Sequence, residues 1–260
     1  MRGDLVAALG IAGKQYVFLV GAGGKTTLMF TMARELAREH RVVTTTSTRI
    51  LRPNPSQSPE ILVQDDVSEL LRQLGARRLG PGHRTIAREV CPDGKLLGFA
   101  PEDLDQIHDA GVADVLLVEG DGAAGLPLKA HADHEPVVSV RADMVVAVVA
   151  ADAPGGLLDD THVHRAHLAR ERLGKSPDAR VTVADVVTLF FHPRGYLRGA
   201  PGDVAVFVSR AGADPSDARV LAAALNAADQ EKVLRRFALG ELVHGERWVE
   251  VWTHPPAGPS

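Results

Sequence analysis

The sequence predicts an α/β fold with a mostly parallel sheet flanked by helices. Short apolar runs alternate with amphipathic helical segments along the chain, which is typical of parallel strands covered by helices. One apolar run, Tyr16 to Val20, leads directly into a glycine-rich turn, and Lys-Thr-Thr follows that turn. A glycine turn between a strand and a helix is the usual context of a phosphate-binding loop. The fold is therefore expected to resemble that of P-loop NTPases.

The predicted strands are apolar on both faces, as in a sheet covered by helices on each side. Val115 to Val118, for example, is a continuous apolar run bounded by Asp114 and Glu119. The predicted strands are Tyr16 to Val20, Arg41 to Thr46, Val115 to Val118, Met144 to Val149 and Asp203 to Val208, with one or two more between Arg235 and Trp252.

The predicted helices are marked by apolar positions at helical spacing or by residues that begin and end helices. Thr182 and Asp185, three residues apart, form a capping-box pattern, and Gly174 is a stop signal. The predicted helices are Thr26 to Glu39, Asp66 to Leu74, Pro101 to Gly111, Thr161 to Leu173, Thr182 to Phe191, and Asp214 to Ala227.

The remaining segments are predicted as connections within a single domain that spans residues 1–254. The proline- and serine-rich stretch Arg52 to Pro59 is predicted to be a surface loop. Asp93-Gly94 is a strong turn signal, so Arg84 to Glu89 and Lys95 to Leu97 are expected to form a hairpin insertion at about residues 80–100. Residues 255–260 are expected to be a disordered tail.

The overall composition excludes several classes of protein. The chain has 260 residues and a formal net charge of −4, so no general positive field favours nucleic acid or an anionic membrane as a partner. The N-terminus lacks the apolar core of a signal peptide, and no stretch approaches the roughly 20 apolar residues of a spanning helix. A single cysteine, Cys91, excludes an intrachain disulfide. We therefore expect a cytoplasmic protein.

The glycine-rich turn is predicted to bind the phosphates of ATP or GTP together with Mg²⁺. Glycines allow backbone N–H groups to approach phosphate oxygens, and the start of the following helix adds unpaired donors. Lys25 is expected to reach the terminal phosphates, and the Thr26 hydroxyl is expected to bind Mg²⁺. The expected nucleotide-binding residues are Gly21, Ala22, Gly23, Gly24, Lys25, Thr26 and Thr27.

The turn is two residues shorter than the common G-x-x-x-x-G-K-[ST] loop and is written G-x-x-G-K-T, from Gly21 to Thr26. This short form resembles the phosphate loop of Mur ligases and folylpolyglutamate synthases. The alternative is a simple glycine turn with a solvated lysine. The strand before the turn and Lys-Thr-Thr after it favour phosphate binding.

Two carboxylates follow a predicted buried strand, at the sheet edge where α/β proteins bind ligands. Glu119 ends that strand, and Asp121 lies two residues further on. We expect Glu119 to bind Mg²⁺ or a Mg²⁺-bound water, and we expect Glu119 and Asp121 to act with Lys25 in catalysis. A structural acid in a glycine turn is the alternative for each carboxylate.

Further polar residues are candidates for contact with a second substrate. The run Thr44 to Arg49 ends a predicted strand, and its hydroxyls and arginine suit either a sheet edge or an anion site. A transition-metal site among the histidines is conceivable but lacks diagnostic spacing. The candidate substrate residues are Thr46, Arg49, Lys129, Glu135, His164 and Arg165. The segment Ser209 to Asp214 lacks the Asn-Lys-x-Asp motif that reads guanine, so the sequence does not indicate which base is bound.

Taken together, three blocks resemble the YqeC family. They are the glycine loop Val20 to Thr27, the threonine run ending at Arg49, and Glu119 to Lys129 with Asp133 to Pro136. His164-Arg165 and the stretch His192 to Gly195 extend the resemblance, which spans roughly residues 15–210. The family is described as an accessory protein of selenium-dependent molybdenum hydroxylases. The resemblance implies a P-loop fold and a role in maturation of the cofactor of such a molybdenum hydroxylase. It also implies a molybdenum hydroxylase or its cofactor as a partner.

The residues leave three functions open. The first is an Mg²⁺-dependent NTP hydrolase or phosphoryl transferase. The second is a chaperone or carrier that binds nucleotide without hydrolysing it. The third is a Mur-like ligase that uses ATP, although the chain leaves little room for the further domains of such enzymes.

Overall fold

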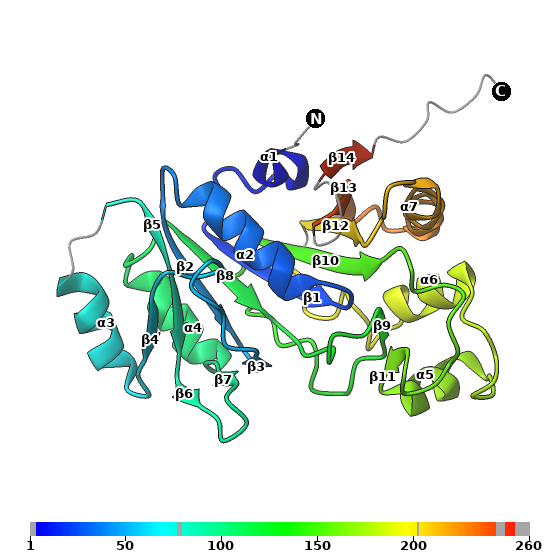
Figure 1. Cartoon of the computed structure of the whole chain (residues 1–260), viewed down its shortest axis with the longest axis horizontal. Helices are drawn as coiled ribbons and strands as arrows, with labels where there is room; N and C mark the ends of the chain where they lie inside the picture. Colours follow the sequence, from blue (N-terminus) through cyan, green and yellow to red (C-terminus); the bar gives the residue numbers. More distant parts are fainter. Residues whose placement is uncertain (1–3, 77–79, 202, 243–247, 253–260) are drawn as a thin grey trace.

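A computed structural model describes residues 4–76, 80–201, 203–242 and 248–252. Over these residues a nine-stranded sheet forms the centre of the molecule, and all its strands are parallel except β14 (Figure 1). Its order is β14 (Trp248–Trp252), β13 (Leu234–Glu241), β12 (Val204–Ser209), β10 (Met144–Ala150), β1 (Tyr16–Gly21), β8 (Val115–Glu119), β2 (Arg41–Thr46), β5 (Gly82–Ala87) and β4 (Ile61–Val63). The predicted α/β class with a mostly parallel sheet is confirmed.

Helices cover both faces of the sheet, which is why its inner strands are apolar throughout. Val17 and Leu19 of β1 pack into one core, whereas Phe18 and Val20 pack into the other. The first core is covered by α1 (Leu5–Leu9) and α2 (Lys25–Leu36). The second is covered by α3 (Val67–Ala76), α4 (Pro101–Asp109), α5 (Ala166–Leu173), α6 (Val183–Phe191) and α7 (Ser216–Ala228).

The carboxyl ends of three neighbouring strands meet at one edge of the sheet. Glu119 at the end of β8 is in register with Leu19 of β1 and with Thr46 of β2. The glycine turn after β1 therefore lies beside Glu119, as expected for a ligand site at the carboxyl edge of a parallel sheet.

Two smaller sheets lie at the same edge. One consists of β3 (Arg49–Ile50), β7 (Leu96–Leu97) and β6 (Glu89–Val90), in that order. The other pairs β9 (Leu128–Lys129) with β11 (Val163–His164). These sheets form the further walls of the site described below.

The prediction of a hairpin between Arg84 to Glu89 and Lys95 to Leu97 is wrong in its first arm. Gly82–Ala87 is a strand of the central sheet, parallel to both β2 and β4. Its Thr85 is fully buried and its hydroxyl contacts that of Thr44 at 2.8 Å. The hairpin is formed instead by Glu89–Val90 and Leu96–Leu97, around the predicted Asp93-Gly94 turn.

The prediction of a helix from Thr161 is also wrong at its start, because α5 begins at Ala166. Val163–His164 pairs with β9, and Arg165 then adopts a left-handed conformation with φ of 59°. The helix α1, whose N-cap Asp4 accepts bonds from Val6 and Ala7, was not predicted.

The other predicted helices are present with boundaries within a few residues, and the capping box of Thr182 and Asp185 is formed. The predicted disordered tail, 255–260, lies outside the described residues. Among the helices that the structure describes, none combines the length and apolar character needed to cross a bilayer.

Candidate phosphate-binding site

The glycine turn adopts a conformation that requires glycine. Gly21, Gly23 and Gly24 have φ angles of 103°, 89° and 124°, which side-chain-bearing residues rarely adopt. A Cβ atom on Gly23 would lie 2.4 Å from the Cβ of Ala150, and one on Gly21 would lie 2.3 Å from the carbonyl oxygen of Val148. Gly21 and Gly23 therefore pack directly against β10, with no space for a side chain at either position.

Replacement of Gly23 by alanine is expected to destabilise the protein more than replacement of Gly174. Both residues have positive φ, which costs an alanine about 1–2 kcal/mol. Only Gly23 meets a wall, however, since no atom lies within 4 Å of a Cβ placed on Gly174. Overpacking should add about 1–3 kcal/mol to the cost at Gly23. Urea unfolding of the two variants measures this difference, and equal losses would contradict the close packing of the turn.

The turn presents a series of backbone N–H groups without partners. Gly21 donates to Asp121 and Ala22 donates to Val148, which fixes the start of the turn. No described residue accepts a hydrogen bond from the N–H groups that follow, those of Gly23, Gly24, Lys25, Thr26 and Thr27. Such consecutive donors at the start of a helix form an anion site, because the helix dipole adds positive potential.

Lys25 is buried beneath the turn, with 3 % of its surface exposed. Its Nζ donates to the carbonyl oxygen of Gly21 at 2.6 Å and lies 3.0 Å from Oδ1 of Asp121 and 3.7 Å from Oε1 of Glu119. Burial alone would lower the pKa of Lys25, but the two carboxylates outweigh burial and raise the pKa. The lysine is therefore held charged next to the unpartnered N–H groups.

Asp121 is the centre of a buried network rather than part of the cavity wall. Its carboxylate accepts the N–H of Gly21 at 2.9 Å and lies 3.2 Å from Nζ of Lys129 and 2.5 Å from Nε2 of His131. Burial would raise its pKa, but Lys25 and Lys129 hold the pKa well below the usual value. This geometry favours a positioning role for Asp121, which holds both the turn and Lys25 in place.

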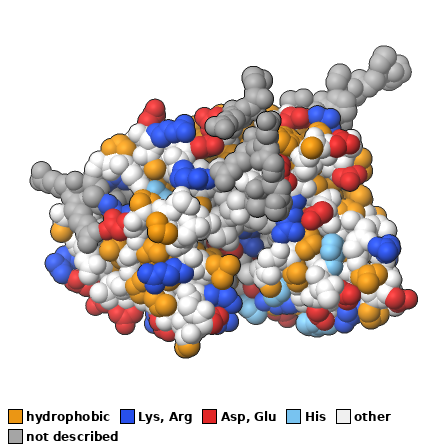
Figure 2. All heavy atoms as spheres, viewed as in Figure 1, with side chains coloured by type: hydrophobic (Ala, Val, Ile, Leu, Met, Phe, Trp, Pro, Cys, Tyr) orange, Lys and Arg blue, Asp and Glu red, His pale blue; other side chains and the backbone are white. Residues whose placement is uncertain are grey.

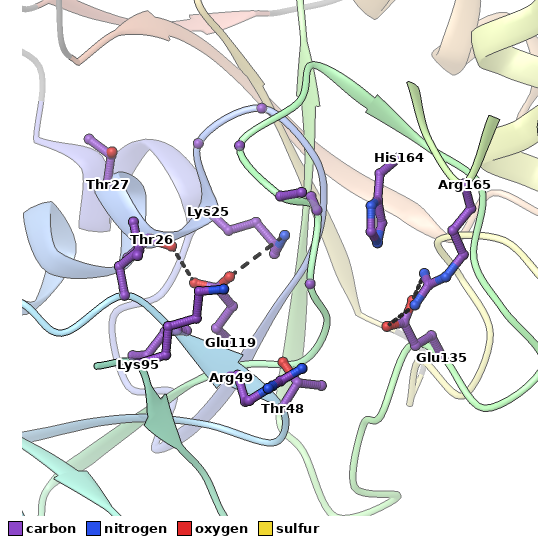
Figure 3. Close-up of a pocket in the computed structure, with 18 of the residues that line it drawn as sticks. Lys25, Thr26, Thr27, Thr48, Arg49, Lys95, Glu119, Glu135, His164 and Arg165 are labelled. Atoms are coloured by element: carbon purple, nitrogen blue, oxygen red, sulfur yellow. Dashed lines mark hydrogen bonds and ion pairs between the residues drawn. The ribbon is translucent and has the colours of Figure 1, made fainter. Parts of the chain in front are cut away.

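Thr26 and Glu119 form a pair of oxygen ligands at the start of α2. The Thr26 hydroxyl donates to Oε2 of Glu119 at 2.6 Å, and both residues line the cavity (Figure 3). Burial raises the pKa of Glu119, although Lys25 and Thr26 oppose the shift. A hydroxyl and a carboxylate fit Mg²⁺, which takes its remaining ligands from water and phosphate. Among the described residues there is no cluster of three or more His, Cys, Asp or Glu side chains suited to a metal ion.

A cavity of about 790 Å³ opens in front of the turn. One wall is formed by residues 23–27 and Glu119, a second by 48–51 and Lys95, and a third by 122–125, 134–135 and 164–165 with Arg210. On the face shown in Figure 2, acidic and basic side chains are interspersed, and basic side chains border the hollow near its centre. The cavity itself is lined by more basic than acidic side chains, which suits an anionic ligand.

The candidate substrate residues are only partly brought together. Arg49, Glu135, His164 and Arg165 line the cavity, but Thr46 and Lys129 do not. Thr46 is buried, and its hydroxyl donates to the carbonyl oxygen of Glu119. Lys129 is fully buried and donates to Gly122 and Glu135. These two residues therefore hold the site in shape rather than face a ligand.

Glu135 joins two elements of the third wall. Its carboxylate accepts hydrogen bonds from the two terminal nitrogens of the Arg165 guanidinium, at 2.5 and 3.0 Å, and from the Lys129 ammonium at 2.8 Å. Burial would raise the pKa of Glu135, but Arg165 and Lys129 lower it to about 2. The Glu135 carboxylate therefore stays ionised, and the positive charges of Arg165 and Lys129 balance its charge.

Several residues of the site were not predicted from the sequence. Ser209, at the end of β12, donates to the carbonyl oxygen of Gly23 at 2.6 Å and supports the turn from below. Tyr196 lies against Gly21, and its ring meets that of His131 edge-on at 4.8 Å. Lys95 and Arg210 line the cavity. A strand end was the available signal for Ser209 and Arg210, whereas Tyr196 and Lys95 follow no local pattern.

Comparison with known proteins identifies the family of this chain. A family model described as YqeC protein matches residues 17–167, which is more than half of the chain. The chain belongs to the YqeC family. It is similar to protein YqeC of Escherichia coli (strain K12), with 34 % identity over 186 residues that cover 71 % of each chain. No solved structure matches the chain.

The part matched by the YqeC model contains most of the site. It includes the glycine turn, both acidic residues after β8, and the Glu135, His164 and Arg165 wall. Ser209 and Arg210 lie beyond the matched residues.

Proposed function

We propose that this YqeC protein binds a nucleoside triphosphate with Mg²⁺ and cleaves its terminal phosphate, by hydrolysis or by transfer. The observation that carries the proposal is the row of unpartnered N–H groups from Gly23 to Thr27, beside a buried charged lysine and the Thr26–Glu119 pair. Such a combination of backbone donors, lysine and oxygen ligands suits a polyphosphate with its cation.

The roles of the residues follow from their positions. The N–H groups of the turn bind phosphate oxygens, and Lys25 moves from Gly21 and Asp121 toward the terminal phosphates. Thr26 and Glu119 would hold Mg²⁺, which would neutralise part of the phosphate charge when bound. Glu119 and Glu135 both line the cavity, but Glu135 is already bound to Arg165 and Lys129. Glu119 is therefore the carboxylate placed to accept a proton from an attacking water or hydroxyl, directly or through a water.

The biological role that we propose comes from the family. YqeC proteins are described as accessory proteins of selenium-dependent molybdenum hydroxylases. We propose that nucleotide cleavage by this chain serves the maturation of such a hydroxylase or its cofactor. The base of the nucleotide, adenine or guanine, is a matter for direct measurement.

A thermal-shift screen with ATP, GTP, CTP and their diphosphates, each with and without Mg²⁺, tests nucleotide binding. A ligand at 100 times its Kd should stabilise the fold by about 2.7 kcal/mol, and the melting temperature should rise accordingly. We expect the largest rise with one triphosphate in the presence of Mg²⁺, together with release of phosphate. A melting temperature that none of the six nucleotides raises above that of the protein alone would contradict the proposal.

A further inference from the structure

The cavity extends beyond the glycine turn and Lys25 to two further cationic side chains, those of Arg49 and Lys95. Arg49 lies on β3 and Lys95 directly precedes β7 in the small sheet of β3, β7 and β6, so neither comes from the glycine turn or α2. Figure 3 shows both side chains reaching into the site near Glu119, whereas His164 and Arg165 lie on the opposite side. The cavity therefore has a second basic wall that comes from a different part of the fold.

This wall is held firmly at the end of β2. Gly98 donates to the carbonyl oxygen of Thr48, and Phe99 donates to that of Thr46, both at 3.0 Å. Ile50 and Leu96 are paired across the two strands and are buried in the core. The small sheet is thus a fixed part of the site.

Arg49 and Lys95 share one face of this small sheet. Arg49 pairs directly with Leu97, and Lys95 lies two residues before Leu97 on the same strand side. Because side chains alternate between the faces of a strand, Lys95 is a diagonal neighbour of Arg49. The burial of Ile50 and Leu96 on the other face directs the two cations toward the cavity.

Arg49 and Lys95 share one nearby carboxylate, that of Asp93. Over the part of the chain that the structure describes, Arg49 makes no direct hydrogen bond or ion pair, although its charge helps to lower the pKa of Asp93. Lys95 pairs with Asp93 at 3.1 Å, and both side chains of this pair are over 40 % exposed. In contrast, Lys25 and Arg165 are already bound to carboxylates. Two neighbouring cations that share a single exposed carboxylate keep a net positive charge, which favours binding of an anion.

The opposite wall is also suited to a polar ligand. The guanidinium of Arg165 is fixed by Glu135, and this leaves His164 beside it on the cavity wall. Burial, and then the positive charges of Arg165 and Lys129, lower the pKa of His164. A neutral imidazole offers one donor and one acceptor without adding charge.

We infer that Arg49 and Lys95, with His164 across from them, form a second anion subsite for a small molecule that carries an oxyanion, either a phosphate ester or a carboxylate. The two subsites lie in one cavity, so this molecule binds beside the nucleotide at the glycine turn. The inference deepens the proposed function, because it defines the chemical class of the second substrate. The guanidinium of Arg49 offers paired donors that match the oxygens of either group.

Titration calorimetry with two matched probes tests this subsite. Phenyl phosphate and benzoate share a ring but differ in the anion, and benzyl alcohol is the uncharged control. Each is titrated into the full chain, first alone and then after saturation with Mg²⁺ and a non-hydrolysable triphosphate analogue. The variants are Arg49→Ala and Lys95→Ala, with Arg52→Ala as a matched control, since Arg52 is an exposed arginine outside the cavity.

We expect at least one anionic probe to bind the nucleotide-saturated protein, and benzyl alcohol not to bind. Arg49→Ala and Lys95→Ala should each lower the affinity for that probe about tenfold or more and change the affinity for nucleotide less than twofold. Arg52→Ala should leave both affinities unchanged. The stronger probe identifies the anion. Equal probe affinity in all variants, or displacement of the probe by nucleotide, would overturn the inference. A protein that binds the probe at Arg49 but no nucleotide would refute the proposed function alone.

Discussion

Replacement of Lys25 by alanine should remove triphosphate cleavage almost completely. Lys25 is the cation beside the unpartnered N–H groups of the turn, and its charge is secured by Asp121 and Glu119. Loss of one such donor to the charge that develops in a transition state costs about 10²–10³ in rate. We therefore expect kcat for phosphate release to fall at least about 100-fold, and nucleotide affinity to fall as well.

Lys14→Ala is the matched control for this variant. Lys14 lies just before β1, at the opposite end of the strand that leads to the turn, and pairs with the exposed Asp203. Its loss should leave phosphate release unchanged. If the Lys25→Ala protein folds and retains full activity, the cleavage takes place elsewhere in the molecule.

Replacement of Asp121 by asparagine should be among the most destabilising single changes in the chain. The substitution removes the carboxylate that Lys25 and Lys129, both buried, share, and leaves Lys25 with Glu119 alone and Lys129 with Glu135 alone. Removal of one member of a buried ion pair costs about 3–5 kcal/mol, because the remaining charge loses a partner that it cannot replace with water. Urea unfolding at neutral pH measures the loss in free energy of unfolding.

Asp143→Asn is the control, because Asp143 also accepts backbone N–H groups at the start of β1 but is exposed. The loss in free energy of unfolding for Asp143→Asn should be much smaller.

The pH dependence of stability gives a second check on Asp121. A carboxyl whose folded pKa is depressed stabilises the fold above its unfolded pKa and loses this effect as pH falls through the folded pKa. The stability gap between wild type and Asp121→Asn should therefore persist down to about pH 4 and narrow only below it. A gap that closes between pH 7 and 5 would contradict the burial network.

The parts of the candidate site that local sequence encodes can be located from the sequence, and their role in nucleotide binding stays a prediction. The turn from Gly21 to Thr26 is continuous in the chain, and its glycines, lysine and threonine each have a conformational or chemical reason to be there. Glu119 was found because a buried strand that ends in an acid is visible in the sequence. The same local signals gave the central strands and most helices.

The parts that depend on tertiary packing were not predictable in this way. Asp121 is close to Glu119 in sequence, but only the fold shows that it faces Lys129 and His131 rather than the cavity. Thr46 is a similar case, because only the fold shows that its hydroxyl donates to the carbonyl oxygen of Glu119 on the neighbouring strand β8. A strong turn signal nearby predicts Arg84 to Glu89 as a hairpin arm, whereas the burial of Gly82–Ala87 between β2 and β4 depends on residues distant in the chain.

The most direct test of phosphate binding is a crystal structure of the protein with Mg²⁺ and a non-hydrolysable triphosphate analogue. We expect phosphate oxygens within hydrogen-bond distance of the N–H groups of Gly24, Lys25 and Thr26. We also expect the Lys25 ammonium to have moved from Gly21 to the terminal phosphates, with Mg²⁺ on Thr26. A nucleotide bound away from the turn, with Lys25 still on Gly21 and Asp121, would contradict the assignment of this turn as the phosphate-binding loop.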